Sequence, residues 1–203
     1  MHQYTYLALG DSYTIGESVL IQKNFPYQVV QRLRKEGYQC APPEIIARTG
    51  WTTGELEAAM KDHRFMEKYD WVTLLIGVNN QYRGLDVIEY KTQFEELLKK
   101  ALELAGGKKD HVILVSIPDY SVTPYSQAMD KEKIARDIDV FNGVSKALSI
   151  QYKLQYVDIT SLSREAASDE SLIAQDGLHP SAIEYEKWAK EIAAVMLKQM
   201  NHK

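Results

Sequence analysis

The stretch LALGDSYTIGE, residues 7–17, joins a short apolar run to a glycine, an acid and a hydroxyl. The apolar run covers residues 4–9 and has the brevity of a buried β-strand. It breaks at Gly10, and Asp11 and Ser12 follow at once. Three interpretations compete for this junction: an ordinary turn, a loop that binds phosphate, or a loop that presents a serine nucleophile. The rest of the sequence has to decide among them.

The alternation of short apolar runs and longer amphipathic segments continues along the chain. Four further runs have strand character: residues 44–48, 71–77, 111–118 and 154–159. Helical patterns occupy residues 26–37, 52–61, 86–107, 130–152 and 181–200. This alternation indicates an α/β fold with a parallel sheet and helices on both faces. Right-handed crossovers favour a doubly wound, five-stranded sheet in the order 2-1-3-4-5. Without repeats or linkers, residues 1–203 are expected to form a single domain.

The helical patterns also predict which side chains face the core. In segment 86–107 the expected buried stripe contains Ile88, Phe94, Leu97, Leu98, Ala101 and Leu102. In segment 181–200 it contains Ile183, Trp188, Ile192, Val195 and Met196. Thr52 or Thr53 is expected to cap segment 52–61, with Glu55 placed to complete a capping box.

Composition and charge exclude several classes of protein. The net charge is −4, with acids and bases mixed along the chain, so no nucleic-acid partner is expected. Cys40 is the sole cysteine, which excludes an internal disulfide and a cysteine-rich metal site. No run approaches the ~20 apolar residues of a membrane span. The chain begins without a secretory signal, which predicts a cytoplasmic protein, although a secreted protein trimmed of its signal would look the same.

Polar residues follow the first three predicted strands at the edge where open parallel sheets bind ligands. Ser12, Gly50 and Asn79 come directly after strands one, two and three. A serine nucleophile needs a base within hydrogen-bond reach and a group that orients the base. In AQDGLHPSA, His179 can supply the base, and Asp176, three residues earlier, can orient its ring. On this motif alone, the alternative that Asp176 merely marks a helix start is equally good.

The other histidines are weaker candidates for the base. His2 and His202 lie near the chain ends, His63 belongs to a charged run, and His111 begins a strand at the opposite edge. For the oxyanion of a tetrahedral intermediate, the backbone N–H groups of Ser12 and Gly50 and the side chain of Asn79 are candidate donors. Each of these positions is also explained by a strand-to-helix turn, which glycine and asparagine favour.

Taken together, these segments resemble the SGNH hydrolases, the GDSL-type lipase and acylhydrolase family. GDSYTIGE, ARTGWTTGE, GVNNQYRG and DGLHPS correspond to four family blocks, in the family's order. The resemblance implies a flavodoxin-like sheet and no metal. It also implies Ser12 as nucleophile, Gly50 and Asn79 as oxyanion donors with the Ser12 amide, and a triad completed by Asp176 and His179. Two positions depart from the family pattern: Tyr13 replaces a leucine, and Asn80 replaces an aspartate that supports its loop.

The sequence therefore predicts a serine esterase or acylhydrolase that cleaves small carboxylic esters through an acyl-enzyme and needs no cofactor. A small-molecule ester is the expected partner, and the oligomeric state is not indicated. Tyr13, Tyr82, Tyr120 and Tyr125 are expected near the pocket mouth, and a rim of this kind suits short acyl groups. A lysophospholipase or thioesterase of the same family remains open. So does a flavin- or phosphate-binding flavodoxin-like module built on residues 12–18.

Overall fold

The computed structural model describes residues 2–201, so His202 lies outside the described residues. Five parallel strands form one sheet in the order β2-β1-β3-β4-β5. They are β1 Tyr6–Asp11, β2 Glu44–Arg48, β3 Trp71–Leu75, β4 Val112–Val115 and β5 Gln155–Val157. The predicted sheet and strand order are confirmed. The third and fourth strands end earlier than predicted, because residues 76–77 and 116–118 leave the ladder and lead into the loops of the ligand edge.

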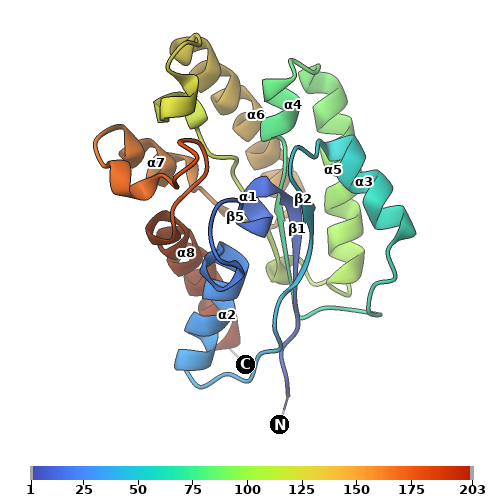
Figure 1. Cartoon of the computed structure of the whole chain (residues 1–203). Coiled ribbons are helices and arrows are strands. Elements are labelled where there is room, and N and C mark those ends of the chain that lie inside the picture. The colour runs from blue at the N-terminus through green and yellow to red at the C-terminus, as the bar shows by residue number, and fades with distance from the viewer. Residues whose placement is uncertain (1, 202–203) are drawn as a thin grey trace.

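Helices cover both faces of this sheet, as Figure 1 shows. The α-helices are α1 Ser12–Ile15, α2 Phe25–Lys35, α3 Thr53–Asp62, α4 Val78–Tyr82, α5 Val87–Leu104, α6 Lys131–Tyr152, α7 Thr160–Ser163 and α8 Ala182–Met200. Short 3₁₀ turns are η1 Ile21–Lys23, η2 Lys109–His111, η3 Tyr120–Val122, η4 Pro124–Ser126, η5 Arg164–Ala167 and η6 Glu170–Leu172. Helices α2 and α8 pack together on one face, and α3, α5 and α6 lie on the other (Figure 1). The short helices α1 and α4 lie at the carboxyl ends of β1 and β3.

The buried stripes of the two long helices differ from the prediction at their first turns. Ile88 is 72% exposed and Ile183 is 53% exposed, so the expectation that both face the core is wrong. The buried aromatic residue near the start of α5 is Tyr90, and near the start of α8 it is Tyr185. At about 100° per residue, a position two residues away lies about 200° around the helix, on the opposite face.

Helix caps place the loops of the ligand edge. Thr52, not Thr53, caps α3, and Glu55 completes the predicted capping box. Asn24 caps α2 by accepting a hydrogen bond from the Tyr27 N–H, and Pro26 occupies the first turn.

Among residues 2–201, no helix is long and apolar enough to cross a membrane.

Candidate active site

Ser12 stands at the junction where β1 becomes α1. The backbone is crowded here: a Cβ added at Gly10 would lie 2.1 Å from Thr14 Oγ1 and 2.4 Å from the Leu75 carbonyl oxygen, which requires glycine. Asp11 ends the strand and caps α1, since its carboxylate accepts a hydrogen bond from the Tyr13 N–H at 3.0 Å. Ser12 is therefore the first helical residue, in a fixed position at the carboxyl edge of the sheet.

A pocket of about 150 Å³ opens directly beside Ser12. Its walls bring together all four sequence blocks and the four predicted tyrosines, and they are largely apolar. The lining residues are Ser12, Tyr13, Thr49, Gly50, Val78, Asn79, Tyr82, Tyr120, Tyr125, Leu178 and His179. The structure thus brings Ser12, Gly50, Asn79 and His179 to one cavity, although they lie far apart in the sequence.

His179 and Asp176 form a bonded pair in the loop before α8. The ring nitrogen Nδ1 of His179 lies 2.6 Å from Asp176 Oδ2. Asp176 Oδ1 accepts the backbone N–H groups of Leu178 and His179, both at 3.0 Å. Burial alone raises the pKa of the Asp176 carboxyl, but the hydrogen bonds it accepts, first among them one from Ser18, hold that pKa well below its usual range. The carboxylate is therefore ionised near neutral pH and can orient the ring.

Because Asp176 is bonded to Nδ1, the second ring nitrogen of His179, Nε2, is the one available to accept a proton, and His179 lines the pocket. The ring is buried and lies against Tyr13, with the two ring centroids 5.1 Å apart. Among residues 2–201, no hydrogen bond joins His179 to the Ser12 hydroxyl, although both line the pocket. In unliganded enzymes such bonds are often long and shorten when substrate binds.

Gly50 and Asn79 face the same pocket from the ends of β2 and β3. Gly50 has a φ of +81°, which a residue with a side chain rarely adopts. Its carbonyl accepts a hydrogen bond from Arg83 Nη2 at 2.5 Å, which fixes the peptide group between Gly50 and Trp51. Asn79 donates from Nδ2 to the Trp51 carbonyl at 3.0 Å and lies 3.5 Å from Asp11 Oδ2. The contact of Asn79 with Trp51 is therefore a short hydrogen bond, whereas its contact with Asp11 is long.

Asn80 supports its loop despite the departure from the family aspartate. Its side chain binds Thr53 at two points: Oδ1 accepts the Thr53 N–H at 3.0 Å, and Nδ2 donates to Thr53 Oγ1 at 2.7 Å. Both residues are buried. The double contact ties the start of α3 to α4 and so joins the loops that carry Gly50 and Asn79.

Asp11 is a buried acid at this edge of the sheet. Its side chain is fully buried, and burial raises the pKa of its carboxyl to about 7, against the opposing effect of the hydrogen bond from the Tyr13 N–H. Asp11 accepts the N–H of Tyr13, which follows β1, and its Oδ2 lies 3.5 Å from Nδ2 of Asn79, which follows β3. The Asp11 side chain therefore contacts both α1 and α4, the helices that follow β1 and β3.

The loop after β4 supplies the third wall of the pocket. Tyr125 and Tyr82 meet at its mouth, with their hydroxyl oxygens 2.7 Å apart and each ring partly exposed. Tyr120 lies deeper and donates to Gln81 at 3.0 Å. The Tyr125 N–H donates to the Gly177 carbonyl at 3.0 Å, which attaches this loop to the one that carries His179.

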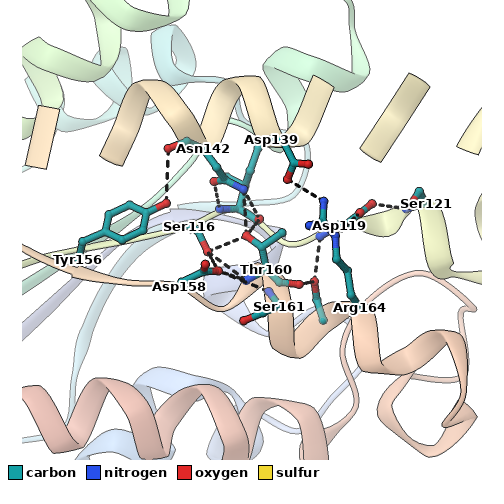
Figure 2. A network of polar contacts seen from close by, with 12 residues as sticks. Ser116, Asp119, Ser121, Asp139, Asn142, Tyr156, Asp158, Thr160, Ser161 and Arg164 are labelled. Atoms are coloured by element: carbon teal, nitrogen blue, oxygen red, sulfur yellow. Dashed lines mark hydrogen bonds and ion pairs between the residues drawn. The ribbon is translucent and has the colours of Figure 1, made fainter. Parts of the chain in front are cut away.

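A polar network, drawn in Figure 2, fixes the path of this loop as it leaves β4. Asn142 of α6 binds the Ile117 backbone twice, accepting its N–H at 2.8 Å and donating to its carbonyl at 3.0 Å. Arg164 joins the buried Asp119 at 2.8 Å to Asp139 of α6 at 2.7 Å. These contacts fix the first residues of the loop, and Tyr120 and Tyr125 further along it line the pocket.

The other histidines among residues 2–201 lie away from the pocket. His63 ends α3 and binds Glu44, while His111 is buried at the amino end of β4 and stacks on Trp71 with the ring centroids 4.5 Å apart. His2 binds Asp70 near the N-terminus. Within the described part of the chain, no three His, Cys, Asp or Glu side chains are placed to hold a metal ion. Cys40 is buried, and burial raises the pKa of its thiol.

Comparison with known proteins identifies the family and related folds. The profile of the GDSL-like lipase/acylhydrolase family matches residues 8–187. An acetylxylan esterase from Geobacillus stearothermophilus is 23% identical over an alignment of 187 residues that covers 86% of this chain and 75% of that protein. The solved structure of Axe2, an acetylxylan esterase from the same organism, has a TM-score of 0.75 at 20% identity, covering 95% of this chain and 93% of that one. A lipase/acylhydrolase from Enterococcus faecalis has a TM-score of 0.75 at 19% identity, covering 95% and 94%.

This chain belongs to the GDSL-like lipase/acylhydrolase family. It is an ester hydrolase by family, and its five-stranded α/β fold is that of the solved relatives.

Three residues of the site were not predicted from sequence: Ser18, Thr53 and Arg83. Ser18 follows the first family block and Arg83 lies in the third. Their partners are distant in sequence, and no residue spacing predicts such contacts. Thr53 was considered only as a helix cap. The pairing of Asn80 with Thr53 could have been suspected, because β2 and β3, the strands that precede them, both lie beside β1.

Proposed function

We propose that this protein is a serine carboxylesterase that cleaves small esters through an acyl-enzyme. The observation that carries the proposal is the shared pocket of Ser12 and His179, with the His179 ring bound to the Asp176 carboxylate at 2.6 Å. A nucleophile, a base and an orienting acid are the three parts that this chemistry requires. Two candidate oxyanion donors, Gly50 and Asn79, line the same cavity.

The proposed reaction has two balanced halves. Ser12 Oγ attacks the acyl carbon while its proton passes to His179 Nε2, and the carbonyl oxygen becomes an oxyanion facing the Ser12 and Gly50 N–H groups and the Asn79 amide. The intermediate collapses as His179 returns the proton to the departing alcohol. Water then attacks the acyl-Ser12 ester and gives a proton to His179, and His179 passes that proton to Ser12 Oγ as the carboxylic acid leaves. Asp176 holds the ring throughout and stabilises its charged form.

The size of the pocket supports short acyl groups. A cavity of about 150 Å³ with apolar walls holds a molecule of roughly the size of benzene. An acetyl or butyryl group fits within this volume, whereas a dodecanoyl chain would extend past Tyr82 and Tyr125 into solvent. The similarity to an acetylxylan esterase supports the same conclusion, since that enzyme's name specifies an acetyl ester.

The competing phosphate-binding interpretation is disfavoured by the start of α1. The Tyr13 N–H, which would face a bound phosphate, is already bonded to the Asp11 carboxylate. Glu17 adds a second acid at the end of this helix. An anion placed there would meet negative charge where it needs free N–H donors.

The proposal is tested with a fluorophosphonate label and a series of nitrophenyl esters from acetyl to dodecanoyl, used below their micelle concentrations. The label should attach to Ser12, and Ser12→Ala should lose labelling and reduce kcat by on the order of 10⁴ or more without a change in Tm. Ser168→Ala, which trims an exposed serine remote from the pocket, is the matched control. Labelling that persists in Ser12→Ala would overturn the proposed nucleophile. A steady rise of kcat/KM with chain length would replace the short-acyl assignment by a lysophospholipase-like one.

A further inference from the structure

Ser18 makes an unexpected contact with the proposed acid of the triad. Its hydroxyl lies 2.6 Å from Asp176 Oδ2, the same oxygen that binds the His179 ring. Because an ionised carboxylate can only accept, the Ser18 hydroxyl is the donor. Asp176 therefore accepts four hydrogen bonds, two at each oxygen. A carboxylate has about four lone-pair sites, so this one is saturated.

The four donors differ in where they come from. Three belong to Leu178 and His179, in the same loop as Asp176. Among residues 2–201, Ser18 is the one hydrogen-bond donor to Asp176 from outside this loop, 158 residues away in sequence. The local bonds fix the carboxylate relative to the ring. The bond from Ser18 fixes the whole pair relative to the segment that carries Ser12.

The backbone at Ser18 is held in an unfavourable conformation for this contact. Its φ is +65°, and within the described residues Lys153 is the other non-glycine residue with positive φ. Such a conformation costs stability and persists where surrounding contacts impose it. Here the preceding turn is anchored at both ends: the Glu17 N–H donates to the Ser12 carbonyl at 3.0 Å, and Asn24 binds the Ile15 carbonyl at 3.0 Å.

The neighbouring residue Glu17 makes a parallel contact with another loop of the site. Its carboxylate accepts a hydrogen bond from the Thr49 hydroxyl, next to Gly50. The turn of residues 16–18 thus extends from the nucleophile helix to the loop of Gly50 on one side and to the loop of His179 on the other. Its position relative to Ser12 is set directly, because the N–H groups of Gly16 and Glu17 both donate to the Ser12 carbonyl.

We propose that Ser18 is a positioning residue for the esterase reaction, which sets the place of the Asp176–His179 pair relative to Ser12. This inference rests on the proposed function, because it assigns Ser18 a task only if Ser12 and His179 react together. Ser18 touches neither substrate nor the reacting atoms and acts through Asp176. It forms a fourth link behind the serine, the histidine and the aspartate.

The test separates the hydroxyl from the backbone with three substitutions. Ser18→Ala removes the donor and keeps the strained backbone, Ser18→Gly removes the donor and relieves the strain, and Ser18→Thr keeps the donor but places a β-branched residue at positive φ. Losing a hydrogen bond to a carboxylate is expected to lower kcat about 10-fold in the first two variants, with KM unchanged. Ser18→Thr should retain most of the parent kcat although its Tm is the lowest of the three.

Lys153→Gly is the matched control for backbone strain, because it relieves the other positive φ far from the site. It should leave kcat at the parent value. Activity that follows Tm across the variants, or Ser18→Gly with full kcat, would overturn the positioning role. Ser12→Ala measured in the same series keeps the two proposals apart: if it stays active, the proposed function fails, and if it is inactive while Ser18→Gly is fully active, only the present inference fails.

Discussion

The fully buried carboxyl of Asp11 should make the protein less stable as pH rises through neutrality. The pKa of this group is raised from 3.8 to about 7 by burial. The folded protein therefore holds a proton that the unfolded chain has released, in the whole window between these values. Since the native state binds more protons there, the free energy of unfolding falls as pH increases. Integrated over the window, the loss reaches about 4 kcal/mol once Asp11 is ionised.

Asp11→Asn is the perturbation that isolates this effect. Asparagine is as good a helix cap as aspartate and can still accept the Tyr13 N–H. Asparagine cannot ionise, so the free energy of unfolding of Asp11→Asn should not show the decrease that ionisation of Asp11 causes near neutral pH. Urea unfolding of both proteins between about pH 5 and pH 8 should show the parent losing roughly 2–3 kcal/mol relative to Asp11→Asn across this range.

The comparison uses the difference between two proteins because other groups titrate in the same experiment. Asp176 has a lowered pKa, so its stabilising contribution is present above the unfolded value and is lost as pH falls into the acid range. That effect is common to both proteins and cancels in the difference. Parallel stability curves for the parent and Asp11→Asn would show that Asp11 ionises at an ordinary pH, and would refute the reasoning from burial.

Three further predictions use nitrophenyl-ester kinetics. His179→Ala should reduce kcat nearly as much as loss of the nucleophile. Asp176→Asn should reduce kcat less, because its Oδ1 can still accept the two backbone N–H groups. A fully active Asp176→Asn would contradict the triad, and added chelator should leave kcat unchanged. Tyr82→Ala should raise the hexanoyl-to-acetyl ratio of kcat/KM by opening the pocket mouth, and an unchanged ratio would remove Tyr82 from specificity. Arg83→Met should lower kcat several-fold, on the scale of one lost hydrogen bond, by freeing the Gly50 carbonyl; parent-like kcat would show that this contact is dispensable.

The strand order and the site pocket were accessible from sequence for a physical reason. Strand and helix alternate, crossovers have one hand, and parallel strands end at one edge, so residues after strands one, two and three must meet. Ser12, Gly50 and Asn79 follow from that rule, and His179 from a loop motif beside the last helix. These are consequences of topology, which short-range patterns determine.

The features that sequence could not supply depend on side-chain direction and distant contacts. Ile88 and Ile183 lie in the first turns of their helices, where an apolar residue fits the composition of the stripe but not its angle. The bond of Ser18 to Asp176 joins segments 158 residues apart. Nothing local requires a serine at that position, because the strained backbone alone would favour glycine or asparagine.

Asn80 illustrates both limits, since sequence identified the departure from aspartate but not its effect. The hydrogen bonds around it run in one direction: Asn80 donates to Thr53 Oγ1 at 2.7 Å, which donates to Gln93 Oε1 at 2.5 Å, and Gln93 Nε2 donates to Glu89 at 2.8 Å. An aspartate at position 80 has no N–H to begin this chain. The Thr53 hydroxyl would have to donate to it, and the Gln93 amide would have to reverse, placing its oxygen against the Glu89 carboxylate.

Asn80→Asp should therefore destabilise the protein at neutral pH, by about 1–3 kcal/mol for the mismatched buried group. The loss should shrink as pH falls, because a protonated carboxyl can donate to Thr53 as the amide does. Glu89→Gln, nearly neutral on its own at an exposed position, should restore part of the stability in the double variant, since its amide can donate to the reversed Gln93 oxygen. Urea unfolding of the four proteins as a double-mutant cycle measures this coupling. If the effects of Asn80→Asp and Glu89→Gln on the free energy of unfolding simply add, the orientation of the Gln93 amide does not depend on residue 80. The hydrogen-bond chain would then not explain the asparagine at position 80.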